Sequence, residues 1–300
     1  MMNRVATSSS ARTMNADLQN SMRALNSIQQ QISSGRRISR VSDGPADAVN
    51  SLTQRAELRR TEQFTRTVDR ARLWLRAGED ALAQVSDRLT TARSLVVQGR
   101  SGAIGAAERS AIAQEIRAIR SSLIGTANAT IDGRPVFGGT TASTAAYDAN
   151  ATYQGDSGAV NLPLAPGIAV TVNAGGPAVF GTFNGGDPTA GDVFQLLESL
   201  AASVASGDTT ATTAGLTLID AAATRAASAQ VSLGTRGGQI EDLDLANLDV
   251  AISLKAGISK AEDVDLAEAL INLRTREAAY QAALQATAKV IQPSLLDFLR

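Results

Sequence analysis

The chain has 300 residues and a nearly balanced charge, with 28 Lys and Arg against 29 Asp and Glu. Cysteine and histidine are absent, which excludes disulfides, thiol chemistry and the commonest general base and metal ligand. Aromatic residues make up only 3% of the chain, so small and aliphatic side chains must fill its interior, which favours long helices over one globular core.

Both ends of the chain carry apolar residues at alternating steps of three and four, the spacing of a heptad. The first stripe lies on a helix predicted over 16–34 and consists of Leu18, Met22, Leu25 and Ile32. The second lies on a helix that begins near Asp263 or Asp265, ends before Pro293, and carries Leu266, Leu270, Leu273, Tyr280, Leu284 and Ile291. Because a heptad stripe is buried only when a partner helix packs against it, the two ends are predicted to pair. Each is marginal alone, so we expect the ends to be mobile in the monomer and ordered on assembly.

The turn at 42–45 precedes a helix predicted from Pro45 to about Gly99, and a second helix should pack antiparallel on it. Two runs of alternating apolar residues, at 160–164 and 168–172, predict paired strands. A Gly-rich strand-and-turn composition then continues to about residue 187. Asp192 is a candidate cap for the next helix, which a break at 207–209 should end. A longer helix is expected from about Ala214 to a stop at 257–259, with a possible kink around 234–238.

These elements predict a mainly α fold with a small β insertion. We expect an elongated antiparallel helical bundle or coiled coil, formed by the N- and C-terminal arms, with the β-rich domain at its tip. The predicted domains are a terminal coiled-coil polymerisation domain (1–40 plus 260–300), a helical rod domain (41–132 plus 190–259) and the inserted β-rich domain (133–189).

The small net charge of −1 hides an asymmetry. Residues 1–130 hold 19 Lys and Arg against 11 Asp and Glu, whereas residues 131–300 hold 9 against 18. We therefore expect N-terminal helices to dock on C-terminal ones, within one chain or between neighbours. The arginine-rich run from Arg55 to Arg76 is interleaved with acids and lacks repeated aromatics, so a solvated or subunit-facing helix is favoured over nucleic-acid binding.

Other sites and targeting signals receive little support from the sequence. The acidic cluster at 262–268 is better explained by helix capping than by a metal site or an acid and base pair. The first residues lack the apolar run of roughly 7 to 15 residues found in a secretory signal. No apolar stretch reaches the roughly 18 residues of a membrane span. We predict no cleaved signal peptide and no contact with a membrane.

Two neighbouring segments, Ser33-Ser34-Gly35-Arg36-Arg37-Ile38 and Val41-Ser42-Asp43-Gly44-Pro45, resemble the signature of bacterial flagellins and their hook-associated relatives. Stretches at 127–140, 153–156, 258–268 and 293–299 support the resemblance, which covers essentially the whole chain. The Asp-Gly-Pro form points to the hook–filament junction type, since flagellins usually read Asp-Asp-Ala-Ala-Gly there. Gly44 is a departure, because the junction type more often carries a second Asp, and a role for that acid cannot be transferred here.

The resemblance implies a structural component of the bacterial flagellum, with no enzymatic activity and no cofactor. The chain would leave the cell through the flagellar export channel and form a homo-oligomeric ring between the hook-side junction protein and flagellin, with an export chaperone as a further partner. The residues predicted to form the assembly interface are Leu18, Met22, Leu25, Ile32, Arg36, Arg37, Ile38, Asp43, Pro45, Asp263, Asp265, Leu270, Leu273, Tyr280, Leu284, Ile291, Leu295, Leu296, Phe298 and Leu299.

Two alternatives stay open at this stage. A minor flagellin would share the terminal helices but would be abundant, whereas junction subunits are few. A secreted enzyme or adhesin would carry its function on the β insertion, and deleting about 133–188 from an adhesin would remove ligand binding while assembly continued.

Overall fold

The computed structural model describes residues 2–141, 143–182 and 191–291, and the side chains of 12–141, 143–182 and 191–288. The chain forms two compact units. The terminal unit comprises Met1–Arg60 and Val250–Arg300, and the bundle unit comprises Thr61–Asp249. The boundaries fall inside the two longest helices, α2 (Pro45–Gly99) and α6 (Thr209–Glu262). The three-domain division made from the sequence stays a prediction.

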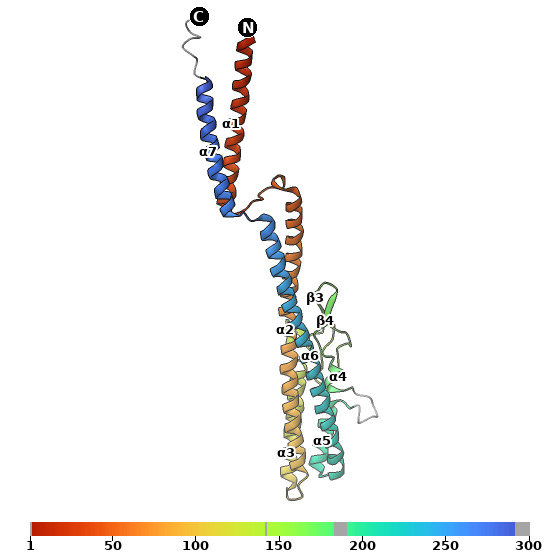
Figure 1. Cartoon of the computed structure of the whole chain (residues 1–300). Helices are drawn as coiled ribbons and strands as arrows, with labels where there is room; N and C mark the ends of the chain where they lie inside the picture. The colour runs from red at the N-terminus through yellow and green to blue at the C-terminus, as the bar shows by residue number, and fades with distance from the viewer. Residues whose placement is uncertain (1, 142, 183–190, 292–300) are drawn as a thin grey trace. The chain divides into compact units, whose positions relative to one another are not determined.

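In the terminal unit, helices α1 (Met2–Ser34) and α7 (Leu266–Ile291) lie side by side, as Figure 1 shows. They are antiparallel, because the amide of Val264, just before α7, donates to the carbonyl of Gly35, just after α1, at 3.0 Å. Gly35 has φ +71°, the left-handed conformation that commonly ends a helix. The predicted pairing of the two ends is therefore confirmed, although α1 begins well before the predicted start at Ala16.

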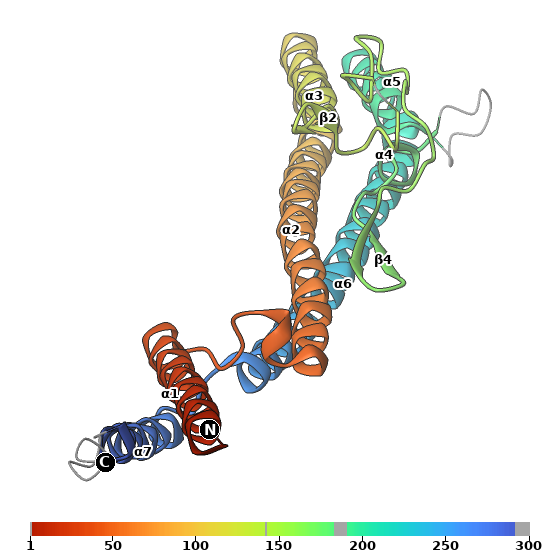
Figure 2. The same cartoon turned by 90° about the horizontal axis from the view of Figure 1, so that it is seen from above.

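The bundle unit combines parts of α2 and α6 with α3 (Ala106–Ala127) and α5 (Val193–Ser206) (Figures 1 and 2). The predicted bounds of α2 are confirmed. The predicted cap of α5 is confirmed as well, since the Asp192 carboxylate accepts from the Phe194 amide at 2.7 Å.

Both predicted ends of α6 are wrong. The helix begins at Thr209, since the Asp208 carboxylate accepts from the amides of Thr210 and Ala211 and caps it. It also continues past Gly257 to Glu262. A Cβ at Gly257 would lie 2.4 Å from Oε1 of Gln54 on α2, so this glycine permits a close contact between helices and is not a stop.

The inserted segment contains two short antiparallel hairpins, β1 (Thr130–Ile131) with β2 (Arg134–Pro135) and β3 (Asn161–Ala165) with β4 (Ile168–Thr171). The second hairpin confirms the predicted strands. Residues 176–180 form a short helix, α4 (Gly176–Phe180), where only strands and turns were expected. Pro177 in its first turn explains this, because the ring presets a helical φ. Residues 183–190 of the predicted strand-and-turn stretch lie outside the described residues.

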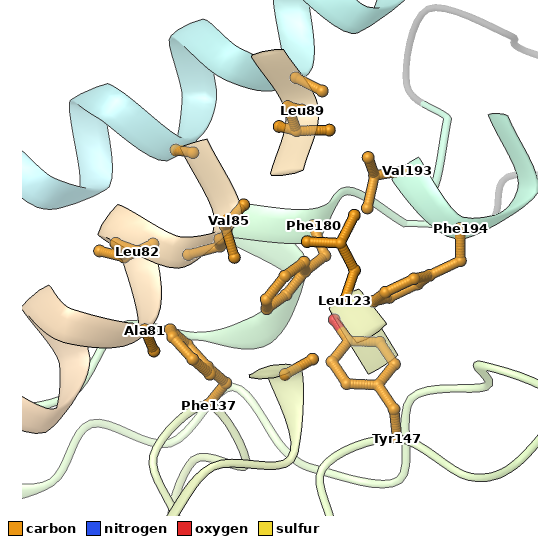
Figure 3. Close-up of a cluster of buried hydrophobic side chains, with 14 of the residues drawn as sticks. Ala81, Leu82, Val85, Leu89, Leu123, Phe137, Tyr147, Phe180, Val193 and Phe194 are labelled. Atoms are coloured by element: carbon orange, nitrogen blue, oxygen red, sulfur yellow. The ribbon is translucent and has the colours of Figure 1, made fainter. Parts of the chain in front are cut away.

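An aromatic cluster joins the insertion to the helices (Figure 3). Phe137 and Phe180, both from the insertion, meet edge to face with ring centroids 5.3 Å apart. Phe180 stacks on Phe194 of α5 at 5.3 Å, and the group packs over Leu82 and Val85 of α2. With Tyr147 and Tyr153, which join the same cluster, half of the chain's ten aromatic residues lie at one place.

Polar contacts hold the described part of the insertion along the flank of α6 (Figure 1). The side chain of Asn247 donates to the Leu164 carbonyl at 2.8 Å, and Arg236 donates to the Asn173 carbonyl at 2.7 Å. The placement at a tip is therefore corrected. The physical reason is the insertion's large aromatic side chains, which need an apolar surface that two short hairpins cannot supply.

The opposite charges of the two halves of the chain pair inside the bundle unit. Arg72, Arg93 and Arg117 each form an ion pair of 2.8 Å with an acid of the C-terminal half, namely Asp244, Asp220 and Glu198. These pairs confirm that N-terminal helices dock on C-terminal ones within one chain. In the described parts of the chain, no helix has the length and apolarity needed to cross a membrane.

Candidate assembly surface and its polar joint

The loop between α1 and α2 contains a short 3₁₀ turn, Val41–Asp43. The Asp43 carboxylate accepts from the amides of Arg40 at 2.8 Å and Ser39 at 3.1 Å. The Arg40 amide, followed by that of Ser39, lowers the pKa of this carboxyl from its ordinary value. Asp43 therefore closes the turn from inside the loop and leads the chain into Pro45, the first residue of α2.

Gly44, the departure noted in the sequence, has φ −175°, which is extended backbone that any residue adopts. A Cβ there would lie 3.2 Å from Cδ1 of Ile38, a buried side chain of the same loop. Glycine at this position thus leaves room for Ile38 to pack under the turn.

The same loop caps the end of α6. The amide of Arg37 donates to the Glu262 carbonyl at 2.6 Å. The Arg37 guanidinium donates to the Ala261 carbonyl and to the Asp47 carboxylate, both at 2.8 Å. A cation at the C-terminal end of a helix also meets the negative end of its dipole. Arg37 therefore ties the signature loop to both long helices within the terminal unit.

The side chain of Glu262 is the centre of this region. It is 9% exposed, and its carboxylate accepts two hydrogen bonds from Arg55, from Nε at 2.8 Å and from Nη2 at 2.5 Å. The Ser51 hydroxyl also donates to it, and the Arg36 guanidinium lies 3.9 Å away. The Arg55 hydrogen bonds lower the pKa of Glu262 to about 2, against the opposing effect of burial. We call Arg37, Ser51, Arg55 and Glu262 the polar joint.

Sequence reasoning missed most of this joint. Glu262 was assigned to helix capping, but its side chain instead pairs across to α2. The available signal was Ser51 and Arg55, spaced four residues apart on one face of a helix. Capping is confirmed for Asp265, whose carboxylate accepts from the amides of Ala267 at 2.9 Å and Glu268 at 3.2 Å. The Asp263 carboxylate accepts a hydrogen bond from the Ser259 hydroxyl. Among the described residues, no cluster of three or more acidic side chains is placed to hold a metal ion.

The apolar residues predicted on α1 and α7 divide between two faces. Leu25 is buried, and Leu18, Ile32, Leu273 and Tyr280 are half-buried. Met22, Leu270 and Leu284 are instead 51%, 48% and 43% exposed. The pairing of α1 with α7 in the single chain therefore covers only part of each predicted stripe, and the role of these residues in assembly stays a prediction.

The covered face of α7 includes a small residue, Ala269, that the predicted stripe lacks. Ala269 is buried, whereas its neighbours Leu270 and Ile271 are exposed. On α1, the half-buried Ile28 completes the covered face and was missed. Ile291 is described only as backbone at the end of α7, and Leu295, Leu296, Phe298 and Leu299 lie outside the described residues.

Exposed apolar side chains remain on both terminal helices. On α7 they are Leu266, Leu270, Ile271 and Leu284, which give this helix a second apolar face, and on α1 the exposed residue is Met22. Two paired helices cover only one side of each other, so these side chains remain in contact with water in the single chain. Exposed apolar patches of this kind mark surfaces that associate. The fold and the surface together are those of a helical subunit with uncovered apolar side chains on its paired terminal helices.

Comparison with known families agrees with this class. The model of the bacterial flagellin N-terminal helical region matches residues 5–142, and that of the bacterial flagellin C-terminal helical region matches residues 216–299. The two matches occur in the expected order and together account for most of the chain. The chain belongs to the bacterial flagellin family.

Its relatives within that family are hook-associated proteins. The chain is 22% identical over 290 residues to flagellar hook-associated protein 3 of Salmonella typhimurium, covering 90% of this chain and 92% of that protein. Its fold is similar to that of a flagellar hook-associated protein from Vibrio parahaemolyticus, with a TM-score of 0.68, 21% identity, and coverage of 74% of this chain and 100% of the other. It is also similar to the flagellar junction protein FlgL from Legionella pneumophila, with a TM-score of 0.58, 16% identity, and coverage of 71% and 99%.

Proposed function

We propose that this chain is a structural subunit of the bacterial flagellum that joins the hook to the filament, and not an enzyme. The observation that carries the proposal is the uncovered apolar side chains of α1 and α7 in a chain of the flagellin family. The similarity to a hook-associated protein 3 over nearly its whole length supports the junction role over that of a filament subunit.

Assembly takes place through the ends of the chain. The uncovered apolar side chains of α1 and α7 pack against neighbouring subunits, which removes Met22, Leu270 and Leu284 from water. Copies of the chain form a ring, with the hook-side junction protein on one side and flagellin on the other. Of the predicted interface residues of the loop, Arg36 lies 3.9 Å from Glu262 of the polar joint, and its backbone pairs with that of Asp263 just before α7.

The subunit reaches this position through the flagellar export channel, without a cleaved signal peptide. Before export, a chaperone covers the ends, because a free apolar face would otherwise promote early association. Location in the flagellum is the common property of the relatives, and the route and the chaperone are the proposed additions.

Electron microscopy of a strain that lacks this chain tests the proposal. Hooks without filaments, together with flagellin shed into the medium, are expected, and intact filaments would contradict the junction role. Quantitative counting of subunits per flagellum separates a junction protein, present in few copies, from an abundant minor flagellin.

A second strain carries the chain truncated after Pro293. This change removes Leu295, Leu296, Phe298 and Leu299 and should leave a soluble monomer with near-normal thermal unfolding that does not build junctions. Filaments on hooks in this strain would show that the last residues are not part of the interface.

A further inference from the structure

The bundle unit contains a pocket that the junction role does not use. Its volume is about 390 Å³, and it lies between α6 and the segment of residues 173–178 that leads into α4. Small-molecule sites usually range from roughly 300 to 1,000 Å³, so this pocket has the size of a small ligand site. Its wall combines two arginines, several hydroxyl groups and an apolar floor that includes Leu233 and Ala229.

The two arginines hold positive charge that the pocket itself does not neutralise. Arg236 donates to the Asn173 carbonyl at 2.7 Å, and Arg225 donates to the Gly191 carbonyl at 3.3 Å, so both known partners are neutral. Nε of Arg225 is buried and has no acceptor among the described residues. No Asp or Glu of the described chain lines the pocket. Burial lowers the pKa of the Arg225 guanidinium, and no opposing effect of a nearby acid accompanies it.

Arg225 is half-buried and its known acceptor is a neutral carbonyl, so its guanidinium keeps a donor and a charge available for an anionic ligand. Arginine also presents a planar set of donors that matches a carboxylate with two parallel hydrogen bonds. The electrostatics of the pocket therefore select an anion, and its donor geometry selects a planar one.

Hydroxyl groups extend along the same wall. Thr224, Ser228 and Ser232 stand on successive turns of α6 at steps of four, so they share one face of the helix. The opposite wall is held in place by Asn173, whose side-chain oxygen accepts from the Val160 amide at 2.8 Å and whose nitrogen donates to the Gly158 carbonyl at 3.1 Å. A row of hydroxyls facing a fixed wall suits a ligand that has several hydroxyl groups of its own.

We propose that this pocket binds a small polyhydroxylated carboxylate of the uronic acid class, either free or as a residue of an acidic polysaccharide. The carboxylate pairs with Arg225, whose Nε lacks an acceptor among the described residues, and the sugar hydroxyls exchange hydrogen bonds with the hydroxyl row of α6, with Arg236 at the other end of the pocket. This binding goes beyond the proposed junction role and does not depend on it.

Titration of the full chain by NMR tests the proposal with D-glucuronate and D-galacturonate as probes. D-glucose supplies the hydroxyls without the charge, and acetate supplies the charge without the hydroxyls. One of the uronates should bind more tightly than both controls by about tenfold, and raising the salt to roughly 0.15 M should weaken its binding. Acetate binding as tightly as both uronates would overturn the proposal.

Two variants locate the binding. The pair R225Q and R236Q should weaken uronate binding by about tenfold or more, whereas R88Q, an exposed arginine on α2, should leave it unchanged. Because the paired variant also loses two hydrogen bonds, Gly175→Leu serves as an independent test. Gly175 lines the pocket with φ −69°, and a Cβ there meets nothing within 4 Å, so leucine fills the pocket without moving the backbone.

The outcomes divide clearly. Loss of uronate binding in both pocket variants, with R88Q unaffected, supports the site. An oligogalacturonate that binds more tightly than the monomer identifies a polysaccharide as the source, and equal affinities identify the free acid. Absence of uronate binding, or binding that survives Gly175→Leu, overturns the proposal, as does binding of an acidic peptide in the place of both uronates.

Discussion

In the bundle unit, apolar side chains from several helices and the insertion cover one another, and Phe137, Phe180 and Phe194 are almost completely buried. In the pair formed by α1 and α7, Leu25 and Ala269 are buried, while Met22 and Leu270 remain about half exposed. The first arrangement encloses its own core. The second leaves apolar side chains of both helices uncovered, so the two regions differ in how completely they bury their own apolar surface.

The strongest test of this difference charges the uncovered face. The double variant Met22→Glu and Leu270→Glu should abolish filament attachment, because two charges cannot be buried in a subunit interface without partners. Thermal unfolding of the purified monomer should barely change, since neither residue is buried in the single chain. Electron microscopy of the complemented strain and calorimetry of the monomer give the two readouts.

The matched control is Leu73→Glu, which charges a 56% exposed leucine on α2 in the bundle unit. Filaments should form normally in this strain. If Leu73→Glu blocks assembly while the double variant permits it, the assembly interface lies on the bundle unit and not on the α1 and α7 pair.

The next largest effect belongs to the bundle core. Phe180→Ala should lower the free energy of unfolding by about 3 to 5 kcal/mol, because it removes a fully buried ring from the aromatic cluster. Urea unfolding followed by the fluorescence of Trp74, which is buried in the same unit, measures the loss. Leu73→Ala should cost less than about 0.5 kcal/mol. Equal losses in the two variants would mean that the cluster does not carry the stability of this unit.

The polar joint predicts an intermediate, pH-dependent effect. The pKa of Glu262 is lowered from 4.5 to about 2, so its contribution to stability is complete above pH 4.5 and is lost as the pH falls toward 2. Glu262→Gln should therefore cost about 2 to 3 kcal/mol at pH 7 and progressively less below pH 4.5. Urea unfolding at pH 7 and pH 3, followed by circular dichroism, measures the difference between variant and parent.

Glu268→Gln is the matched control, because it also removes one acid near the short connection between α6 and α7. Glu268 is exposed in the first turn of α7, so only a few tenths of a kcal/mol, roughly, depend on its charge. A Glu262→Gln difference that stayed constant between pH 7 and pH 3 would show that the bidentate pair with Arg55 is not the source.

Local signals explain which parts of the fold could be predicted. Pro45 begins α2 because proline favours a helix start, Gly35 ends α1 in the left-handed conformation, and Asp192 and Asp265 cap the helices that follow them. Gly257 carries the same local signal as Gly35 but does not end a helix. Its small size instead admits Gln54 from another helix, which no neighbouring residue reveals.

In the polar joint and its loop, too, contacts between residues close in sequence were predictable and contacts between distant residues were not. Asp43 and Pro45 act within their own loop, so the motif predicted their structural roles in the turn and at the helix start. Glu262 pairs with Arg55, 207 residues away, and its neighbours in the sequence suggested only a cap. The heptad spacing of α1 alone does not show which side of the helix faces α7. A heptad stripe admits Ser21 or Met22 on the seam, and the structure half-buries the serine while exposing the methionine.

Two glycines in long helices give the smallest predicted effects, with opposite signs. A Cβ at Gly78 of α2 would lie 2.8 Å from Cδ1 of the buried Leu233 on α6, so Gly78→Ala should destabilise the bundle unit by about 1 to 2 kcal/mol through overpacking. A Cβ at Gly234 of α6 meets nothing within 4 Å, so Gly234→Ala should stabilise the same unit by about 0.5 to 1 kcal/mol through helix propensity alone. The urea unfolding midpoint should fall below that of the parent for Gly78→Ala, if overpacking dominates, and rise above it for Gly234→Ala, if helix propensity dominates. If both alanines stabilise, α2 and α6 have room to separate, and the bundle core is less tightly packed than its buried side chains indicate.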